Sequence, residues 1–239
     1  DQGDTRPETC WTVRNTGRTL VEGLEGIAEP RALIMLKRVQ GDEQYREVLE
    51  VLEAELSRLT GIDMASHYRD GLMTILISSP GRVTPYHMDG EANLLMQISG
   101  TKSVYIFDGN NREVLPSGEL EKFWSGDIHA PVYREHLQDR AQRFELAPGL
   151  GVSNPVIFPH WVQNGPEVSI SLSVNFKRRV DNLAGAQAGN AGYLRNVLGG
   201  LIGNAGQIDN LAEGSIDNEG SVENLSGGVF GNAGSFGNR

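Results

Sequence analysis

The sequence contains a single cysteine, Cys10. One cysteine excludes an intramolecular disulfide and a zinc site built from cysteines, and a chain without disulfides is expected in the cytoplasm. The sequence also lacks the run of about 18 apolar residues that a membrane-spanning helix needs. No charged-then-apolar signal sequence opens it. Because the first residue is not methionine, the possibility of a removed targeting segment stays open.

The sequence also has fewer basic than acidic residues. The formal net charge is −10, from 21 Lys and Arg against 31 Asp and Glu. A protein that wraps nucleic acid needs an excess of basic residues to neutralise phosphates, so we expect no nucleic-acid partner. The lack of a membrane-spanning run predicts no membrane partner. A small anion is still allowed, since one buried Lys or Arg is enough to hold it.

The composition of the 239 residues, 38% hydrophobic and 22% charged, is that of a chain with a packed core. One large β-rich domain, or a domain with an appendage, is expected at this length. Residues 31–37 predict a strand. Residues 42–60 predict a helix packed on a sheet, with Asp42 as its cap and Thr60-Gly61 as its end. Its apolar residues recur at helical spacing: Tyr45, Val48, Leu49, Leu52, Leu56 and Leu59.

From residue 72 to residue 176, short apolar segments alternate with turn residues, which is typical of strands. The last segment places Ser169, Ser171, Ser173 and Asn175 on one face. A polar face on a central strand predicts a barrel with a wet pocket rather than a filled core. Residues 108–142 show little periodicity and predict an insertion or lid over the barrel. The predicted strands are 72–78, 83–88, 93–98, 103–107, 143–146, 155–159 and 168–176.

The last part of the chain, residues 181–239, is a repeat. Asn182, Asn196, Asn210, Asn224 and Asn238 recur every fourteen residues. A fixed period with Asn and apolar positions is typical of a small β-solenoid, whereas the Gly- and Asn-rich composition also allows a flexible tail. The repeats are interpreted as a binding or spacing module, or alternatively as a substrate carried in cis.

Three residues form a candidate metal site. His87 and Asp89 are two apart, which on an extended strand puts both on one face. His160 joins them only if the fold brings its strand alongside, as a barrel does. Two histidines and one carboxylate, with other positions open, are the ligand set of non-haem Fe(II) oxygenases. His67, His129 and His136 lack this context, and we expect them on the surface or in the lid.

Four further residues predict the binding of a dianionic co-substrate beside the metal. Such a molecule needs a cation for its far carboxylate, together with hydroxyl and amide donors. Lys102 is the candidate cation, and Thr84, Asn93 and Asn175 are the candidate donors.

The motifs Thr84-Pro-x-His87-x-Asp89-x-x-x-Asn93 and Gln97-Ile-x-Gly100-x-Lys102 resemble those of the JmjC and cupin-like Fe(II)/2-oxoglutarate oxygenases. They are especially similar to the branch that contains the asparaginyl hydroxylase of hypoxia-inducible factor. The segment from Pro159-His160-Trp to Asn175-Phe looks like the second-histidine region of bacterial cupin-like members. The resemblance spans residues 30–178.

This resemblance implies a mainly β double-stranded β-helix, or jelly roll, in residues 1–180, with a flanking N-terminal helix. It implies Fe(II) bound by His87, Asp89 and His160, and 2-oxoglutarate contacted by Thr84, Asn93, Lys102 and Asn175. O2 would be consumed, succinate and CO2 released, and a substrate hydroxylated or demethylated. The substrate would be a protein or peptide side chain, or a small molecule.

Other interpretations stay open. The repeat replaces the C-terminal helices that support dimerisation in bacterial members, so a homodimer by that route is in doubt. Tyr86, Trp124 and Trp161 are candidates for the substrate mouth or for packing. The chain is alternatively a non-catalytic cupin-type module that binds a ligand or partner, or a metal-dependent isomerase or dioxygenase without 2-oxoglutarate. The complete ligand set favours an enzyme over the module, and Lys102 favours 2-oxoglutarate.

Overall fold

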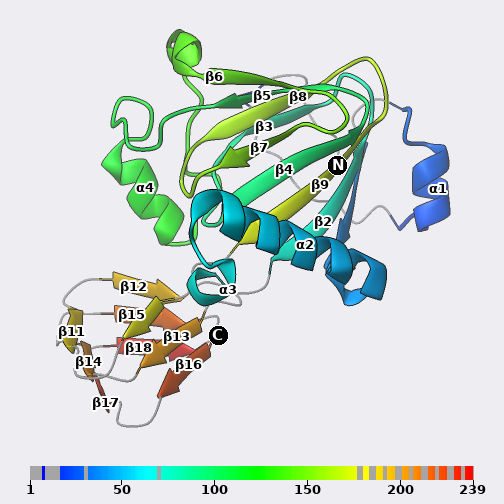
Figure 1. The fold of residues 1–239 in the computed structure, drawn as a ribbon. Helices are drawn as coiled ribbons and strands as arrows, with labels where there is room; N and C mark the ends of the chain where they lie inside the picture. The colour runs from blue at the N-terminus through cyan, green and yellow to red at the C-terminus, as the bar shows by residue number, and fades with distance from the viewer. Residues whose placement is uncertain are drawn as a thin grey trace. The chain divides into compact units, whose positions relative to one another are not determined.

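The computed structural model describes residues 7–8, 17–29, 32–68 and 71–176, and, in the rest of the chain, the backbone of strand segments between residues 180 and 238 (Figure 1). Cys10 and the side chain of His67 lie outside the described part. The chain divides into two units, residues 1–49 with 72–175 and residues 50–71 with 176–239. No helix among the described residues is both long enough and apolar enough to span a membrane.

The first unit is built on two β-sheets. One sheet has the strand order β1-β2-β9-β4-β7, and the other has the order β3-β8-β5-β6. The pairs β1–β2, β2–β9, β4–β7, β3–β8, β5–β8 and β5–β6 are antiparallel. The strands are β1 (Leu33–Lys37), β2 (Leu72–Ser78), β3 (Val83–His87), β4 (Ala92–Ser99), β5 (Lys102–Ile106), β6 (Gln142–Leu146), β7 (Gly151–Asn154), β8 (His160–Asn164) and β9 (Ser169–Phe176).

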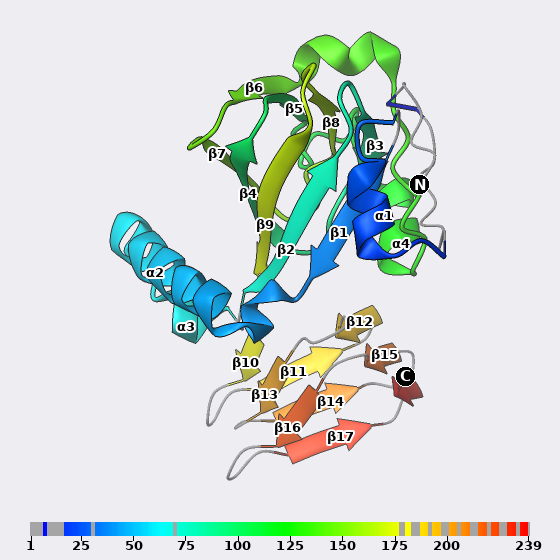
Figure 2. The same ribbon diagram turned by 90° about the vertical axis from the view of Figure 1, so that its right-hand side faces the viewer.

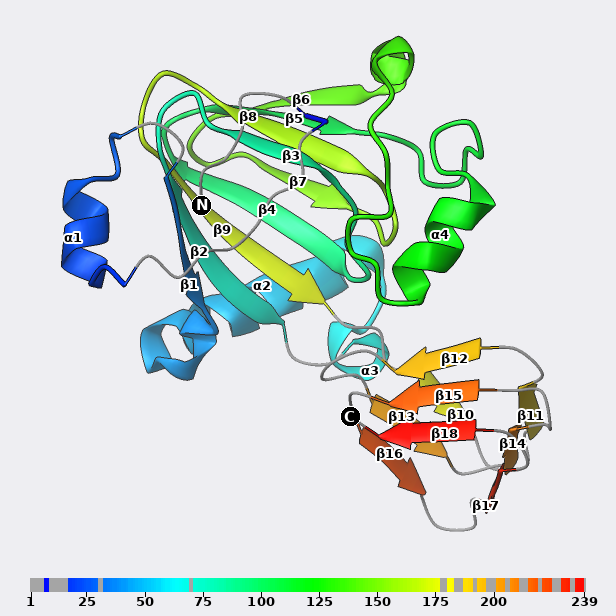
Figure 3. The ribbon, with the colours of Figure 1, turned by 180° about the vertical axis from the view of Figure 1, so that it is seen from behind.

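From β2 onward the chain passes from one sheet to the other at each step, apart from the antiparallel neighbours β5 and β6 (Figure 3). The unit is therefore mainly β, as predicted, and its strand order is consistent with the expected jelly roll. The crossing from β4 to β5 turns at Gly100, whose φ is +70° and where a Cβ would lie 2.6 Å from the Val168 carbonyl oxygen. Only glycine fits this turn, which sets the start of β5 at Lys102.

Apolar residues pack on both faces of the four-stranded sheet. Val104 and Val162 belong to a buried cluster with Val152 of the other sheet. Their sequence neighbours Tyr105 and Trp161 belong to a second cluster, which packs against Leu137 of the insertion. Successive residues of a strand point to opposite faces, so one face of this sheet lines the interior and the other supports the insertion.

One predicted strand was wrong. Residues 155–159 form a turn between β7 and β8 rather than a strand. Pro155 has no N–H to donate to a ladder, and Ile157 has a positive φ of 61°. The consequence is that His160 begins a strand instead of following one. The other predicted strands agree with β2, β3, β4, β5, β6 and β9 to within a residue or two at their ends.

The short helix α1 (Leu20–Glu25) lies beside β1 (Figure 2), where a Cβ on Gly23 would be 3.2 Å from the Ile34 side chain. The predicted helix over residues 42–60 corresponds to α2 (Glu43–Thr60), and Asp42 Oδ1 accepts a hydrogen bond from Gln44 N, 3.0 Å. The expectation that its apolar stripe packs on a sheet overestimated how much of the helix is buried. Leu49 is its one buried residue, and the exposed positions of the predicted stripe include Val48 and Leu59.

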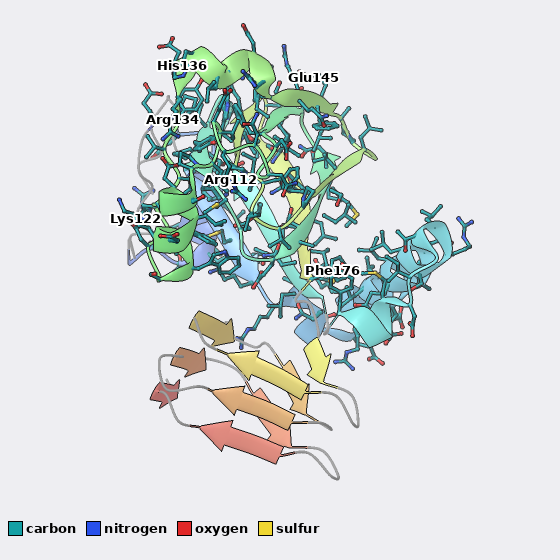
Figure 4. All side chains as sticks on the ribbon, turned by 90° about the vertical axis from the view of Figure 1, so that its left-hand side faces the viewer. Arg112, Lys122, Arg134, His136, Glu145 and Phe176 are labelled. Atoms are coloured by element: carbon teal, nitrogen blue, oxygen red, sulfur yellow. The ribbon has the colours of Figure 1, made fainter. Side chains whose placement is uncertain are left out.

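The insertion over residues 108–142 contains the helix α4 (Ser117–Trp124) and the 3-10 segment η2 (Glu135–Arg140). Arg134 and Glu119 form an ion pair that ties the residues before η2 to α4. Lys122 on α4 and His136 on η2 lie at the outer surface (Figure 4). The segment is an insertion between β5 and β6, and because no residue of it lines the cavity described below, its alternative role as a lid over the barrel stays a prediction.

The second unit includes α3 (Met64–His67) and the strand segments of the Asn repeat. The segments form three parallel sheets, β10-β13-β16, β11-β14-β17 and β12-β15-β18. The register pairs Asn182 with Asn204 and Asn190 with Asn210, not Asn182 with Asn196. Each sheet thus takes every third strand, so the coil is longer than the fourteen-residue sequence period. Whether the whole tail is a solenoid or flexible stays a prediction, because its other residues lie outside the described part.

The segments of the repeat, each ending in Asn, are β10 (Val180–Asn182), β11 (Gln187–Asn190), β12 (Tyr193–Asn196), β13 (Leu201–Asn204), β14 (Gln207–Asn210), β15 (Ser215–Asn218), β16 (Ser221–Asn224), β17 (Val229–Asn232) and β18 (Ser235–Asn238). The Asn positions stack in register within each sheet.

Candidate metal centre

Two histidines that are distant in the sequence face each other across neighbouring strands. His87 is the last residue of β3, His160 is the first residue of β8, and the two are register partners in that antiparallel pair. Their ring centroids lie 4.2 Å apart, with the ring planes at 50°. Paired residues on adjacent strands present their side chains on the same face of a sheet, so strand pairing brings the two imidazoles together.

Asp89 lies in the loop that follows β3. A hydrogen bond from Ile157 N to the Asp89 carbonyl oxygen, 2.9 Å, holds this loop. The Asp89 Oδ2 atom lies 3.8 Å from His160 Nε2, and ligand atoms of Asp89 and both histidines all lie within 4.8 Å of one another. Two ligands bound at right angles about 2.1 Å from a metal ion are about 3 Å apart. Small side-chain movements are therefore enough to bring all three residues onto one ion.

The backbone sets which ring nitrogen of each histidine faces the centre. His87 Nδ1 lies 2.7 Å from the Pro85 carbonyl oxygen, and His160 Nδ1 lies 3.1 Å from the Phe158 carbonyl oxygen. A carbonyl oxygen only accepts hydrogen bonds, so both Nδ1 atoms carry the hydrogen. Each Nε2 is then the unprotonated ring nitrogen, which is the form that binds a metal ion. This tautomer is the one in which metal-ligating histidines are held by their backing groups.

The pKa of His160 is lowered to about 4, first by burial and then by the neighbouring His87, with Asp89 acting in the opposite direction. His160 is consequently neutral near pH 7, and its contact with Asp89 is not an ion pair. Metal ligands must be deprotonated, so burial prepares His160 for a metal without competition from a proton.

Asn154 supplies a test of whether a metal fits. Its Nδ2 lies 2.9 Å from His160 Nδ1, while its Oδ1 is buried without a hydrogen-bond partner. With the hydrogen on Nδ1, two donors would face each other. Turning the amide gives up the long hydrogen bond from Nδ2 to the Phe158 carbonyl oxygen, 3.4 Å, and places Oδ1 where it accepts from the closer Nδ1–H, and amide oxygen and nitrogen are exchanged in this way when the bonding network requires it. The residues present therefore fit a metal-ligating His160, and with His87 and Asp89 they suit a divalent transition metal such as iron.

A cavity of about 350 Å³ lies between the two sheets and includes the three candidate ligands. Its size is that of a small-molecule site. Alternate residues of the strands line it, as expected when one face of each strand points inward. The lining residues are Leu33, Met35, Lys37, Thr74, Leu76, Ser78, Arg82, Thr84, His87, Asp89, Asn93, Leu95, Lys102, Val104, Asn154, His160, Val162, Asn164, Ser173 and Asn175.

One part of this cavity, named here the cation end, is formed by Ser78, Arg82, Thr84, Lys102 and Asn164. Lys102 is the register partner of Asn164 at the far end of β8 from His160. At about 3.3 Å per residue, His160 and Asn164 lie about 13 Å apart along β8. The cavity thus has a candidate metal site and a cationic site separated along one strand.

Lys102 is only 5% exposed, and its pKa is lowered to about 8, first by burial and then by the charge of Arg82. Within the described residues, the side-chain ammonium of Lys102 has no hydrogen-bond or ion-pair partner. Arg82 is equally buried, and burial lowers its pKa to about 10. Two cations in one buried wall make this part of the cavity suited to an anion.

Arg82 was not predicted as a site residue from the sequence. Its Nη1 donates a hydrogen bond to Thr84 Oγ1, 2.9 Å. Arg82 lies two residues before Thr84, so strand alternation puts these two side chains on one face, and the irregularity between Thr84 and His87 brings His87 to the same cavity. Asn164, Asn154 and Ser78 were missed as well, because single polar residues on strands carry no spacing signal.

The two predicted asparagines meet across β4 and β9. Asn93 Nδ2 donates to Ser173 Oγ, 2.7 Å, and to Asn175 Oδ1. Asn175 Nδ2 in turn donates to Glu91 Oε2, 2.9 Å, in the loop after Asp89. A chain of hydrogen bonds therefore connects the amides to the loop that carries a candidate ligand. All residues predicted for the site lie around this one cavity, and their roles stay predictions.

The prediction that the serine face of β9 lines a polar, solvent-accessible pocket is confirmed only in part. Ser169 and Ser171 are fully buried and do not line the cavity. Gln97 Nε2 donates to Ser169 Oγ, 3.0 Å, and Ser171 Oγ donates to Gln97 Oε1, 2.7 Å. This half of the face is filled by a satisfied polar network, whereas Ser173 and Asn175 line the cavity.

None of the three candidate mouth aromatics lines the cavity. Trp161 stacks on Tyr105 with ring centroids 4.0 Å apart, and its Nε1 donates to Gln138 Oε1, 3.1 Å. Tyr86 packs edge-on against Phe107, and Trp124 against Phe123. These are packing residues. His129 and His136 are exposed, as predicted.

No family model matches the sequence, and no curated protein matches it. The solved structures that match include the following distant likenesses. The oxalate decarboxylase of Lactobacillus farciminis is 18% identical with a TM-score of 0.32, covering 48% of this chain and 25% of its own. A recombinant oxalate oxidase in complex with glycolate is 16% identical with a TM-score of 0.31, covering 45% and 42%.

The DMSP lyase DddQ of Ruegeria pomeroyi is 12% identical with a TM-score of 0.28, covering 44% of this chain and 37% of its own. The matched parts span less than half the length of these three proteins. At these identities and TM-scores, the likenesses assign neither a family nor an activity to the chain.

Proposed function

We propose that this chain is an Fe(II)- and 2-oxoglutarate-dependent oxygenase that hydroxylates a protein or peptide side chain or a small molecule. The observation that carries the proposal is the presence, in one cavity, of His87, Asp89 and His160 together with Lys102, a buried cation whose ammonium has no partner among the described residues. A three-residue metal site alone suits many reactions. A buried cation at a distance from it favours a ligand that has one group for the metal and a carboxylate at its other end.

The balanced reaction is the consumption of 2-oxoglutarate, O2 and a substrate C–H, with release of succinate, CO2 and the substrate alcohol. Iron, when bound, would supply the activation of O2 that no amino acid side chain provides. Its ligands would be His87, Asp89 and His160. The Nδ1–H groups of the two histidines are backed by carbonyl oxygens. The remaining steps depend on what the chain does with the organic molecules.

Lys102 would neutralise the far carboxylate of 2-oxoglutarate, and Thr84 would donate a hydrogen bond to it. Asn93 and Asn175 would orient the end of the molecule nearer the metal, supported by Glu91. Apolar cavity residues such as Leu76, Leu95 and Val104 would exclude water between the two ends. An apolar middle with polar ends suits a short aliphatic diacid.

Formation of succinate tests the proposal. The protein is incubated aerobically with Fe(II), ascorbate and 2-oxoglutarate, and succinate is followed by proton NMR. We expect slow formation without a primary substrate, none with His160→Ala, and far less with Lys102→Ala. Ser153→Ala is a control, because this exposed side chain lies on β7 outside the cavity. If the protein binds 2-oxoglutarate but forms no succinate, the alternative of a non-catalytic ligand-binding module is favoured and the oxygenase is rejected.

A further inference from the structure

Ser78 and Asn164 connect the two sheets at the cation end. Asn164 Nδ2 lies 2.9 Å from the Ser79 carbonyl oxygen and 2.7 Å from Ser78 Oγ. Because a carbonyl oxygen only accepts, the contact with Ser79 fixes which end of the Asn164 amide carries hydrogens. The two amide hydrogens are therefore directed at Ser79 and Ser78, and the Ser78 oxygen is an acceptor in this bond.

The direction of this bond leaves the hydroxyl hydrogen of Ser78 unassigned. A serine hydroxyl has one hydrogen and two acceptor lone pairs. Ser78 is 4% exposed, and its hydroxyl donates to no acceptor among the described residues. A buried donor without an acceptor is costly. Since Ser78 lines the cavity, its hydrogen is available to a molecule bound there.

Thr84 is arranged in the same way. Arg82 Nη1 donates to Thr84 Oγ1, so the threonine oxygen is also an acceptor and its hydrogen also has no acceptor within the described residues. The buried ammonium of Lys102 adds further N–H donors to the same wall. Two hydroxyl hydrogens and a cation, all lining one part of the cavity, suit an oxyanion with several lone pairs, such as a carboxylate.

We infer that Ser78 is a third donor to the far carboxylate of a dicarboxylic ligand, beside Lys102 and Thr84, and that Asn164 is the residue that positions it. This inference rests on the proposed function, because it assigns a further contact to the same co-substrate. Asn164 acts through Ser78: its amide occupies the serine oxygen and thereby turns the hydroxyl hydrogen away from the protein. The Ser78–Asn164 pair is a specificity determinant for a ligand with a carboxylate at its far end.

The test measures binding rather than turnover. Zinc-loaded protein is titrated by calorimetry with 2-oxoglutarate and with 2-oxopentanoate, which has the same carbon chain but a methyl group in place of the far carboxylate. We expect wild type to bind 2-oxoglutarate at least about a hundredfold more tightly, because 2-oxopentanoate leaves the buried donors unsatisfied. This comparison alone decides whether a subsite for the far carboxylate exists.

Ser78→Ala and Ser78→Cys then test the new residue. Alanine removes the hydroxyl, and cysteine keeps the volume with only a weak donor. We expect each variant to bind 2-oxoglutarate about tenfold more weakly, with unchanged affinity for 2-oxopentanoate. Asn164 retains its bond to the Ser79 carbonyl oxygen in both variants. If the alanine variant does not fold, the cysteine variant gives the answer.

Ser171→Ala is the matched control, because it deletes another buried serine hydroxyl that does not line the cavity. We expect it to leave both affinities unchanged. If wild type discriminates between the two acids but the Ser78 variants behave like Ser171→Ala, the role of Ser78 is rejected and the proposed function stands. If wild type does not discriminate, the subsite for the far carboxylate is absent and both proposals are overturned.

Discussion

His87 and His160 are register partners at the end of the β3–β8 pair, with their ring centroids 4.2 Å apart. Each ring is backed by a carbonyl oxygen of its own chain segment, Pro85 for one and Phe158 for the other. The metal site therefore depends on the pairing of two strands and on the turn before β8. Strand pairing and a short turn hold the two histidines, which favours preformed positions for these two ligands, whereas Asp89 lies in the loop after β3.

Asn154 should matter for metal affinity although it is not a ligand. Asn154→Ala removes the acceptor that we assign to His160 Nδ1–H, and loss of such a backing group typically costs about tenfold or more in metal affinity. Calorimetric titration with Zn(II) or Co(II) measures this change. Ser153→Ala on the same strand is the control and should bind as wild type does. Equal affinities of the Asn154 variant and wild type would refute the assigned role.

The affinity for 2-oxoglutarate should depend on pH through Lys102. Its pKa is lowered to about 8 by burial and by Arg82. A depressed lysine pKa means that the charge is present below pH 8 and lost above it. We therefore expect the affinity to be constant near pH 7 and to fall above pH 8, by up to tenfold per pH unit. 2-Oxopentanoate, which has no far carboxylate, should show no such fall.

Arg82 should set the position of that pH dependence. The Arg82 charge contributes to the lowered pKa of Lys102 after burial. Arg82→Met removes this repulsion, so the loss of affinity should move to higher pH without disappearing. Lys102→Met should instead bind weakly at all pH values from 7 to 10. An unchanged midpoint in the Arg82 variant would show that the two charges do not interact in solution.

Trp161 should contribute to stability rather than to ligand binding. Trp161→Phe keeps a ring against Tyr105 but removes the hydrogen bond to Gln138 and leaves some space. We expect the free energy of unfolding to fall by about 1–2 kcal/mol, measured by urea denaturation. The affinity for 2-oxoglutarate should change by less than about twofold. A large loss of affinity with unchanged stability would place Trp161 at the ligand site instead.

Much of the β architecture was accessible from the sequence because its strands alternate or end at turn residues. The alternation of β9 predicted which residues face inward, and Gly100 marked the turn before Lys102. The turn between β7 and β8 was mistaken for a strand, since a short apolar segment around Ile157 does not reveal its positive φ. The period of the Asn repeat was visible, but the number of strands in one coil depends on which strands pair.

The candidate site was predicted where residues share a motif and missed where they are single. His87 and Asp89 share a strand end, and the resemblance connected His160 to them. Arg82, Ser78 and Asn164 come from three separate segments, and only the packing of the two sheets brings them to Lys102. Likewise, nothing in the spacing of Ser169 and Ser171 shows that Gln97 fills their part of the interior.

The most direct test is an anaerobic titration of the metal-free protein with Fe(II) and then 2-oxoglutarate, followed by visible absorption. Chelation of the iron by a 2-oxo acid is expected to give a weak charge-transfer band. The band should appear in wild type, vanish in His160→Ala, and require more 2-oxoglutarate in Lys102→Ala. A wild-type protein that binds iron but develops no band with 2-oxoglutarate would contradict the account and leave a ligand-binding module.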